Sequence, residues 1–226
     1  MGEREALDAW ADELQTVIET SNNGGRAIVL RETDSTQDAA RRMGANIGDV
    51  VVACRQTAGR GRLGRTWSDT ADAGVAMTCV SPPAKPERLA IASAVAVALA
   101  IASLFQNESE AQIKWPNDVL LKGRKVAGIL IEQNEKASHI GIGINVHQRD
   151  WPADLAATAI SLDQAGARTD RLHVMVAVIR KLREVNAWPD EQIVKAFSAR
   201  DAMIGAFARF SCNGQQFEGR VLRVDP

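Results

Sequence analysis

The feature that most restricts the fold is an uncharged stretch in the middle of the chain, LAIASAVAVALAIASLF, which covers residues 89–105. Its 17 residues are at the short limit for a membrane span. Alanine recurs at every second position and imitates the period of a strand, yet alanine favours helices and is depleted in strands. Alanine also contributes little to membrane insertion. We therefore predict a buried helix that lies on a β-sheet, and no membrane span.

The other apolar segments predict the sheet and the remaining helices. Candidate strands cover residues 27–30, 48–56, 74–80, 113–133 (two strands joined by a turn) and 137–146. Candidate helices cover residues 3–20, 34–43, 169–188 and 190–197, and a hairpin is expected at 205–226 around Asn213-Gly214. Strands in the middle and helices beside them indicate an α/β protein with a central mixed β-sheet flanked by helices.

Length and composition bound the domain plan and the class of partner. The chain has 226 residues with 46% hydrophobic content, which suits either one large domain or one domain with a small appendage. We expect an N-terminal helix at 1–23, a main domain at 24–200 and a C-terminal hairpin at 201–226. The net charge of -1 lacks the basic excess of a nucleic-acid binder. Three scattered cysteines and three histidines make no zinc spacing, so no metal site is expected. The charged N-terminal segment has no secretory core and favours the cytoplasm.

The densest motif is RQTAGRGRLGRTW at residues 55–67. Its glycines match the letters of the dinucleotide fingerprint, but loop residues follow it where that fingerprint requires a helix. It also lacks the Gly-Lys-Ser/Thr end of a Walker A loop. Closely spaced arginines supply forked donors for a substrate whose negative charge changes during reaction, such as a triphosphate that loses pyrophosphate. A flexible, solvated loop is the alternative.

Two further segments hold polar groups near predicted element ends. In DSTQD, Ser35 and Asp38 have capping-box spacing, which predicts either a plain helix cap or hydroxyls and amides facing a neutral polar ligand. In KWPND, Lys114, Asn117 and Asp118 surround a proline turn, which is either structural, with its tryptophan as filler, or part of a site.

Lys125 stands where the apolar segment VAGILIE begins. It is either an exposed strand-end residue or a ligand contact. Gly128, three residues on, lets a ligand approach the backbone closely and so favours the ligand contact.

Together these motifs resemble the catalytic domain of the biotin–protein ligases, from about residue 28 to the C-terminus. The resemblance rests on GRGRLGRTW, KWPND and KVAGIL in this order, with DSTQ, Gln56, GIGIN and AISLDQAG. It implies the mixed-sheet fold shared with lipoate ligases and a small SH3-like C-terminal barrel. It also implies two steps: biotin and MgATP form biotinyl-5′-adenylate, and a lysine of a biotin carboxyl carrier protein then takes the biotinyl group.

The resemblance also implies roles for individual residues. Biotin contacts are expected from Ser35, Thr36, Gln37, Gln56, Arg60, Gly61, Arg62, Lys125 and Gly128. ATP contacts are expected from Arg60, Arg62, Arg65, Trp67, Lys114, Asn117, Lys125 and Asn145. The catalytic residues would be Lys125, Arg60 and Asp118. Lys125 would reach both the biotin carboxylate and the α-phosphate.

The sequence departs from the family pattern in three ways. Gln37 stands where the family usually has asparagine. No helix-turn-helix domain precedes the ligase domain, so we expect a ligase without a repressor role and without DNA as a partner. The chain ends at RVLRVDP, where the family continues through further strands, so we expect an incomplete SH3-like segment.

Two other functions stay open on the sequence. One is a biotin-binding regulator with little ligase activity, which the incomplete segment favours and the arginine loop opposes. The other is a lipoate or octanoate ligase on the same fold, which the GRGRLGR loop and Gln56 oppose. Homodimers occur in the family, although no segment marks a dimer interface.

Overall fold

A seven-stranded mixed sheet forms the centre of the computed structural model, which describes residues 3–20, 24–68, 73–105, 111–212 and 214–223. The strand order is β1-β2-β3-β7-β6-β5-β4. The strands are β1 (Ala27–Thr33), β2 (Val50–Gln56), β3 (Gly74–Ser81), β4 (Gln112–Lys114), β5 (Asp118–Leu121), β6 (Arg124–Gln133) and β7 (Ser138–Asn145). Strands β1 and β2 are parallel and the other neighbours are antiparallel, which confirms the predicted mixed sheet.

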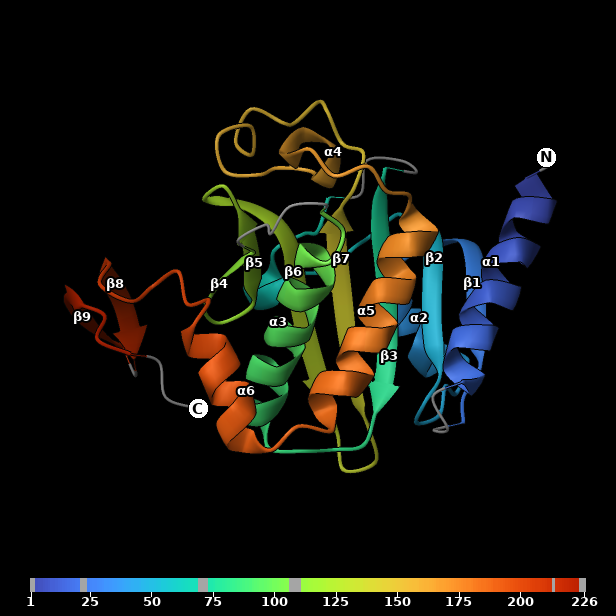
Figure 1. The fold of residues 1–226 in the computed structure, drawn as a ribbon, viewed down its shortest axis with the longest axis horizontal. Coiled ribbons are helices and arrows are strands. Elements are labelled where there is room, and N and C mark those ends of the chain that lie inside the picture. Colours follow the sequence, from blue (N-terminus) through green and yellow to red (C-terminus); the bar gives the residue numbers. More distant parts are fainter. Residues whose placement is uncertain (1–2, 21–23, 69–72, 106–110, 213, 224–226) are drawn as a thin grey trace.

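One face of the sheet is covered by the helices α3 (Pro86–Ala102) and α5 (Arg171–Asn186), which lie side by side in front of it in Figure 1. Strand β7 meets them with Ile140, Ile142 and Ile144, each at most 3% exposed. Helix α3 is buried along almost its whole length, as the apolar run predicted. No helix in the described part of the chain is long and apolar enough to cross a membrane.

Helix α1 (Glu3–Glu19) closes the β1 edge of the same core. Its residues Leu14, Val17 and Ile18 are fully buried or nearly so, and they join the cluster that α3 and α5 form. Arg183 of α5 donates to the carbonyl oxygens of Val17 and Ile18, both at 2.9 Å, and so satisfies the end of α1. The N-terminal helix thus packs as part of the main domain.

Helix α2 (Thr36–Arg42) lies on the opposite face of the sheet, over β2, β3 and β7. Ala39 and Ala40 are buried against Val51, which forms a small second core. Because α2 covers only part of this face, the neighbouring stretch of β6 and β7 is left for the loop 57–68 and for a pocket.

The C-terminal part begins with α6 (Asp190–Ser198) and ends with a two-stranded sheet of β8 (Phe207–Cys212) and β9 (Gln215–Arg220). This hairpin stands apart from the main sheet in Figure 1. Its predicted turn residue Asn213 lies outside the described residues. The segment after α6 is tied to β4, because the Ile113 amide donates to Arg200 O at 2.7 Å and the Ala202 amide donates to Ile113 O at 2.8 Å.

Two elements were not predicted. The segment 113–133 holds three strands, because the turn at Trp115-Pro116 separates the short β4 from β5. A one-turn helix, α4 (Leu162–Ala165), begins with a capping box between Ser161 and Gln164 and ends at Gly166, whose φ is 103°. The sequence carries the signals for both ends of α4, because Ser161 is followed three residues later by Gln164, and Gly166 comes shortly after.

Candidate functional site

A cavity of about 730 Å³ opens on the α2 side of the sheet, between β6, β7, the turn before β5 and the loop 57–68. Its size fits a ligand of the size of a nucleotide adduct. It is lined by all but one of the residues predicted to bind biotin or ATP or to act in catalysis: Ser35, Thr36, Gln37, Gln56, Arg60, Gly61, Arg62, Arg65, Trp67, Lys114, Asn117, Asp118, Lys125 and Gly128. The exception is Asn145.

The floor of the cavity is formed by three glycines and Leu130 on β6 and β7. Gly128 pairs with Gly143, and Leu130 pairs with Gly141. Gly141 and Gly143 alternate with the isoleucines that pack against α3 and α5, so these pairs lie on the opposite face of the sheet. A Cβ on Gly143 would lie 2.3 Å from the Trp67 indole, and one on Gly128 would lie 2.8 Å from it. The glycines therefore let a flat ring lie directly on the strands, where any side chain would hold it off.

Neutral polar groups occupy the α2 end of the cavity. The Thr36 amide donates to Gln56 Oε1 at 2.8 Å, and the Thr36 hydroxyl donates to the same oxygen at 3.2 Å. Thr78 from β3 donates its hydroxyl to Thr36 Oγ1 at 2.9 Å. Gln37 is 3% exposed and donates from Nε2 to the carbonyl oxygens of Leu130 and His139. The amide of Gln37 therefore spans the β6–β7 ladder over Gly141.

The predicted capping box at Ser35 and Asp38 was wrong. Ser35 is the N-cap of α2 by position, but its side chain makes no capping hydrogen bond. Asp38 forms ion pairs with Arg41 and Arg60, both near 3 Å, so its carboxylate points away from the helix start. The Ser35 residue lines the cavity and is 3% exposed, which fits the ligand-facing interpretation.

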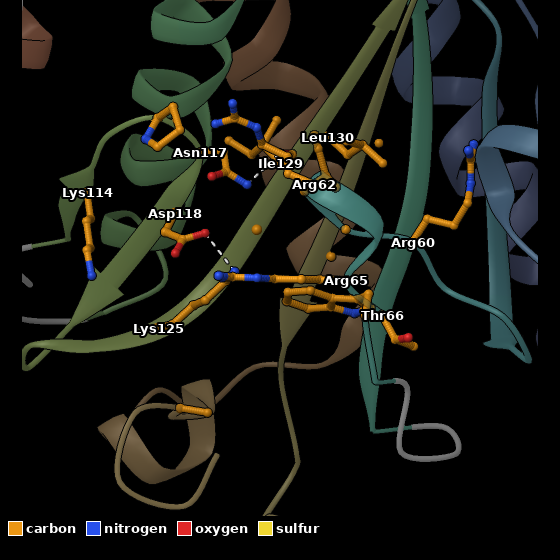
Figure 2. A pocket seen from close by; sticks show the side chains of 18 of the residues that line it. Arg60, Arg62, Arg65, Thr66, Lys114, Asn117, Asp118, Lys125, Ile129 and Leu130 are labelled. Atoms are coloured by element: carbon orange, nitrogen blue, oxygen red, sulfur yellow. Dashed lines mark hydrogen bonds and ion pairs between the residues drawn. The ribbon is translucent and has the colours of Figure 1, made fainter. Parts of the chain in front are cut away.

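Charged groups occupy the other end of the cavity. Lys125 Nζ lies 2.7 Å from Asp118 Oδ1 and 5.5 Å from the centre of the Trp67 ring. In Figure 2, Arg65 extends from the loop toward the Lys125–Asp118 pair, and Lys114 stands beyond it. Several cations thus converge with one carboxylate, an arrangement that suits a polyanionic ligand.

The arginine–glycine loop is a small hairpin. Arg60 bridges Thr66, the Gly61 amide donates to Arg65 O at 2.7 Å, and the Trp67 amide donates to Gly59 O at 2.9 Å. Its tip is a short turn, Arg62–Gly64. Leu63 at the tip has a φ of 55° and is 91% exposed, which is unusual for a residue with a side chain. The root of the loop is hydrogen-bonded, while the tip contributes little to the core.

Arg60 differs from the other arginines of the loop. Its guanidinium donates to both oxygens of Glu132, at 3.1 and 2.8 Å, and pairs with Asp38 at 3.1 Å. In Figure 2 its side chain points away from Lys125 and Arg65. Arg60 therefore lines the cavity while its charge is paired elsewhere.

The two asparagines of the predicted site are bound to backbone groups. Asn117 donates from Nδ2 to Ile129 O at 3.1 Å, which fixes the turn before β5 against β6. Asn145 is 5% exposed and donates to Lys125 O and Ile160 O at 3.3 and 3.2 Å. Asn145 thus holds the backbone of Lys125 in place and does not line the cavity.

Sequence reasoning missed several residues of the site. The segment 155–159 closes one side of the cavity, because the Lys125 amide donates to Thr158 O at 2.7 Å. No motif marks this segment in the sequence. Thr78 follows an apolar stretch of β3 and Glu132 follows the apolar stretch of β6, and each faces the α2 side of the sheet. A polar residue next to an apolar stretch of a strand was the available signal for both.

Fold and site together define a class of protein: α/β proteins with a mixed central sheet and a ligand pocket over the glycines of its middle strands. The family model described as "Biotin/lipoate A/B protein ligase family" matches residues 29–148. The chain belongs to this family.

Relatives and solved structures agree on the family. The chain is 34% identical to the biotin--[acetyl-CoA-carboxylase] ligase of Mycobacterium tuberculosis, over 96% of this chain and 87% of that protein. It is 32% identical to the bifunctional ligase/repressor BirA of Bacillus subtilis, over 94% of this chain and 71% of that protein. The biotin protein ligase of Aquifex aeolicus, solved in complex with biotin and ATP, superposes with a TM-score of 0.80 at 27% identity, covering 88% of each chain.

Proposed function

We propose that the protein is a biotin–protein ligase. It activates biotin with MgATP to biotinyl-5′-adenylate and transfers the biotinyl group to a lysine of a biotin carboxyl carrier domain. The observation that carries the proposal is one cavity with neutral hydrogen-bonding groups at one end and converging cations at the other. Relatives named as biotin ligases and the similarity to a ligase bound to biotin and ATP support it.

The first step joins two anions. An oxygen of the biotin carboxylate attacks the α-phosphorus of ATP, the bond from that phosphorus to the bridging oxygen breaks, and pyrophosphate leaves with the electron pair. Mg²⁺ enters as part of the MgATP substrate. Cations must lie between the carboxylate and the phosphates, because the two repel each other until the new bond forms. Lys125 has this position next to Asp118, which orients its ammonium group at 2.7 Å.

Each end of the cavity takes one part of the adenylate. Ser35, Thr36, Gln37 and Gln56 bind the ureido group of biotin, because it needs neutral donors and acceptors. Gly61 and Gly128 let the ligand approach the backbone. Arg62, Arg65, Lys114 and Lys125 neutralise the phosphates, Trp67 lies beside the adenine, and Asn117 holds the turn that precedes Asp118. Asn145 acts on the nucleotide through the backbone of Lys125.

The second step is an ordinary acyl transfer. The amine of the carrier lysine attacks the carbonyl carbon of the mixed anhydride, a C–N bond forms, the C–O bond to the phosphate breaks, and AMP leaves. The amine loses a proton in this step. Asp118 faces the cavity beside Lys125 and is the carboxylate that accepts it.

One experiment separates this function from the two alternatives. The protein is incubated with MgATP and either biotin with an apo biotin carrier domain or lipoate with an apo lipoyl carrier domain, and the carrier mass is measured. A biotin ligase adds one biotinyl group and leaves the carrier unmodified with lipoate, whereas a lipoate ligase does the reverse.

A biotin-binding regulator modifies neither carrier but shows biotin binding by calorimetry. Preformed biotinyl-5′-adenylate in place of biotin and MgATP tests the second step alone. An unmodified carrier in every arm, with a positive control ligase active on the same carrier, would refute the proposal. The homodimer stays a prediction, which sedimentation of the purified protein tests.

A further inference from the structure

Four charged side chains join three of the elements that contribute residues to the cavity. Glu132 comes from β6, Asp38 and Arg41 come from α2, and Arg60 comes from the loop. Arg60 binds Glu132 through two hydrogen bonds of 3.1 and 2.8 Å and lies 3.1 Å from Asp38. Arg41 donates to Asp38 at 3.0 Å and also donates to Glu132. Each carboxylate is thus shared by both arginines, and we call this group the Glu132 cluster.

The alternation of β6 explains why Glu132 lies here. Gly128, Leu130 and Glu132 point to the same face of the sheet and pair in turn with Gly143, Gly141 and His139. Along this row, Trp67 covers the first pair and Gln37 the second. The third pair lies under the Glu132 cluster, so the cluster continues the floor of the cavity.

The cluster is more than a set of surface contacts. Its four side chains are between 30% and 40% exposed, and the bond between Arg60 and Glu132 is the two-pronged type that is geometrically specific. Burial alone would raise the pKa of Glu132, but hydrogen bonds from Arg41 and Arg60 outweigh burial and hold the pKa below its usual range. A network of shared charges with such geometry fixes its members better than an isolated exposed pair does.

Arg60 is the residue through which the cluster acts on the loop. It stands at the loop root, opposite Thr66, between the two hydrogen bonds that Gly61 and Trp67 donate across the hairpin. A fixed Arg60 therefore fixes the strand of the loop that carries Arg65 and Trp67. Without the anchor, the glycines at 59, 61 and 64 would let this backbone sample many other conformations.

We propose that Glu132, with Asp38 and Arg41, is a positioning residue for the ligase reaction. The cluster anchors Arg60 so that the loop presents Arg65 and Trp67 to the adenylate. The guanidinium of Arg60 is a tether in this arrangement and does not neutralise substrate charge. The inference rests on the proposed function only for the identity of the ligand, because the anchoring itself belongs to the protein alone.

The test compares Glu132→Gln with the unchanged protein and with Glu184→Gln, which removes the partner of Lys181 on the outer helix α5. The first readout is amide hydrogen exchange without added ligand. The Gly61 and Trp67 amides report directly on the loop root, and we expect faster exchange there in Glu132→Gln alone. Unchanged exchange at both amides would overturn the proposal whatever the activity.

The second readout is the dissociation rate of preformed biotinyl-5′-adenylate. We expect it to rise about five- to twentyfold in Glu132→Gln, the effect of losing one partly exposed charge-assisted pair. The KM for ATP should rise more than kcat falls, because the lost interaction positions groups around the bound ligand. Unchanged dissociation, or the same changes in Glu184→Gln, would overturn the positioning role.

Charge exchange tells the tether from a direct contact with substrate. If Arg60 acts through Glu132, the double variant Arg60→Glu/Glu132→Arg should recover part of what Arg60→Glu loses. If Arg60 neutralises substrate charge, the double variant should be no better than the single one, and the tether is wrong. Failure of the unchanged protein to form any adenylate would refute the proposed function instead, and the exchange measurement would still decide the anchor.

Discussion

Gly143→Ala should disturb the site while leaving the fold nearly intact. A Cβ at this position would lie 2.3 Å from Trp67 Cε2 and 2.6 Å from Cζ2. Ordinary carbon contacts need about 3.5–4.0 Å, so the indole must move by roughly 1–1.5 Å. The indole belongs to the loop 57–68 and can move outward, whereas the backbone of β7 lies in the middle of the sheet and cannot.

The displacement should appear in catalysis more than in stability. A misplacement of about 1 Å in a reacting group typically lowers the rate on the order of 100-fold. Overpacking in a rigid core costs about 1–3 kcal/mol, and the outward movement of a surface loop relieves most of that. We expect adenylate formation, followed as pyrophosphate release in a single turnover, to slow by one to two orders of magnitude. The melting temperature should fall by less than about 4 °C.

Two comparisons make the prediction sharp. Gly219→Ala in β9 is the same substitution where a Cβ would meet nothing within 4 Å, and it should change neither rate nor melting. Trp67→Ala/Gly143→Ala should be no slower than Trp67→Ala, because without the indole the new methyl group displaces nothing. A double variant clearly slower than Trp67→Ala would mean that the methyl group meets the ligand itself, and the reasoning from Trp67 would be refuted.

Three further predictions concern other parts of the molecule. Lys125→Ala should slow pyrophosphate release in a single turnover by about 10²–10³-fold without changing the melting curve, and Lys125→Arg should restore only part of the rate; near-normal release would make it a plain strand-end lysine. Gln56→Ala should weaken biotin binding by roughly 1–3 kcal/mol in calorimetry and ATP binding less, because the ureido group of biotin would lose a hydrogen-bonding partner in a buried site. Burial alone would raise the pKa of Asp49, but hydrogen bonds from Arg26 and nearby amides lower it, so its contribution to stability is present above about pH 4 and is lost as the pH falls through the lower folded value. Urea unfolding over a pH series should therefore show less acid sensitivity in Asp49→Asn than in the unchanged protein.

The regular elements and most of the cavity could be predicted because their signals are local. The period of two in IGIGI predicts a strand, and the long alanine-rich run predicts a buried helix. The polar motifs then fall at the ends of these elements, where the topology brings them together around one cavity. The short β4 was missed because three residues carry too little pattern to separate from a turn.

The rest of the site depends on contacts between distant segments. Asp38, Arg60 and Glu132 are far apart in sequence, and no spacing rule could join them before the sheet order was known. The spacing of Ser35 and Asp38 predicted a capping box for the same local reason. No capping box forms, because the Asp38 carboxylate makes ion pairs with Arg41 and Arg60. Asn145 was expected to contact the nucleotide, but its Nδ2 group donates to the carbonyl oxygens of Lys125 and Ile160. Local motifs therefore indicate the kind of site, while tertiary ion pairs decide which arginine of the loop has its charge already paired.

Strands β6 and β7 separate stability from function by face. On β7, Ile140, Ile142 and Ile144 face the helices, and Gly141 and Gly143 between them face the cavity. Shortening an isoleucine removes buried apolar contact and leaves a hole, so it should lower the free energy of unfolding and leave the floor of the cavity in place. Enlarging a glycine adds volume only on the ligand side, so it should change binding first. A strand with a period of two can thus hold a core and a ligand floor in the same eight residues.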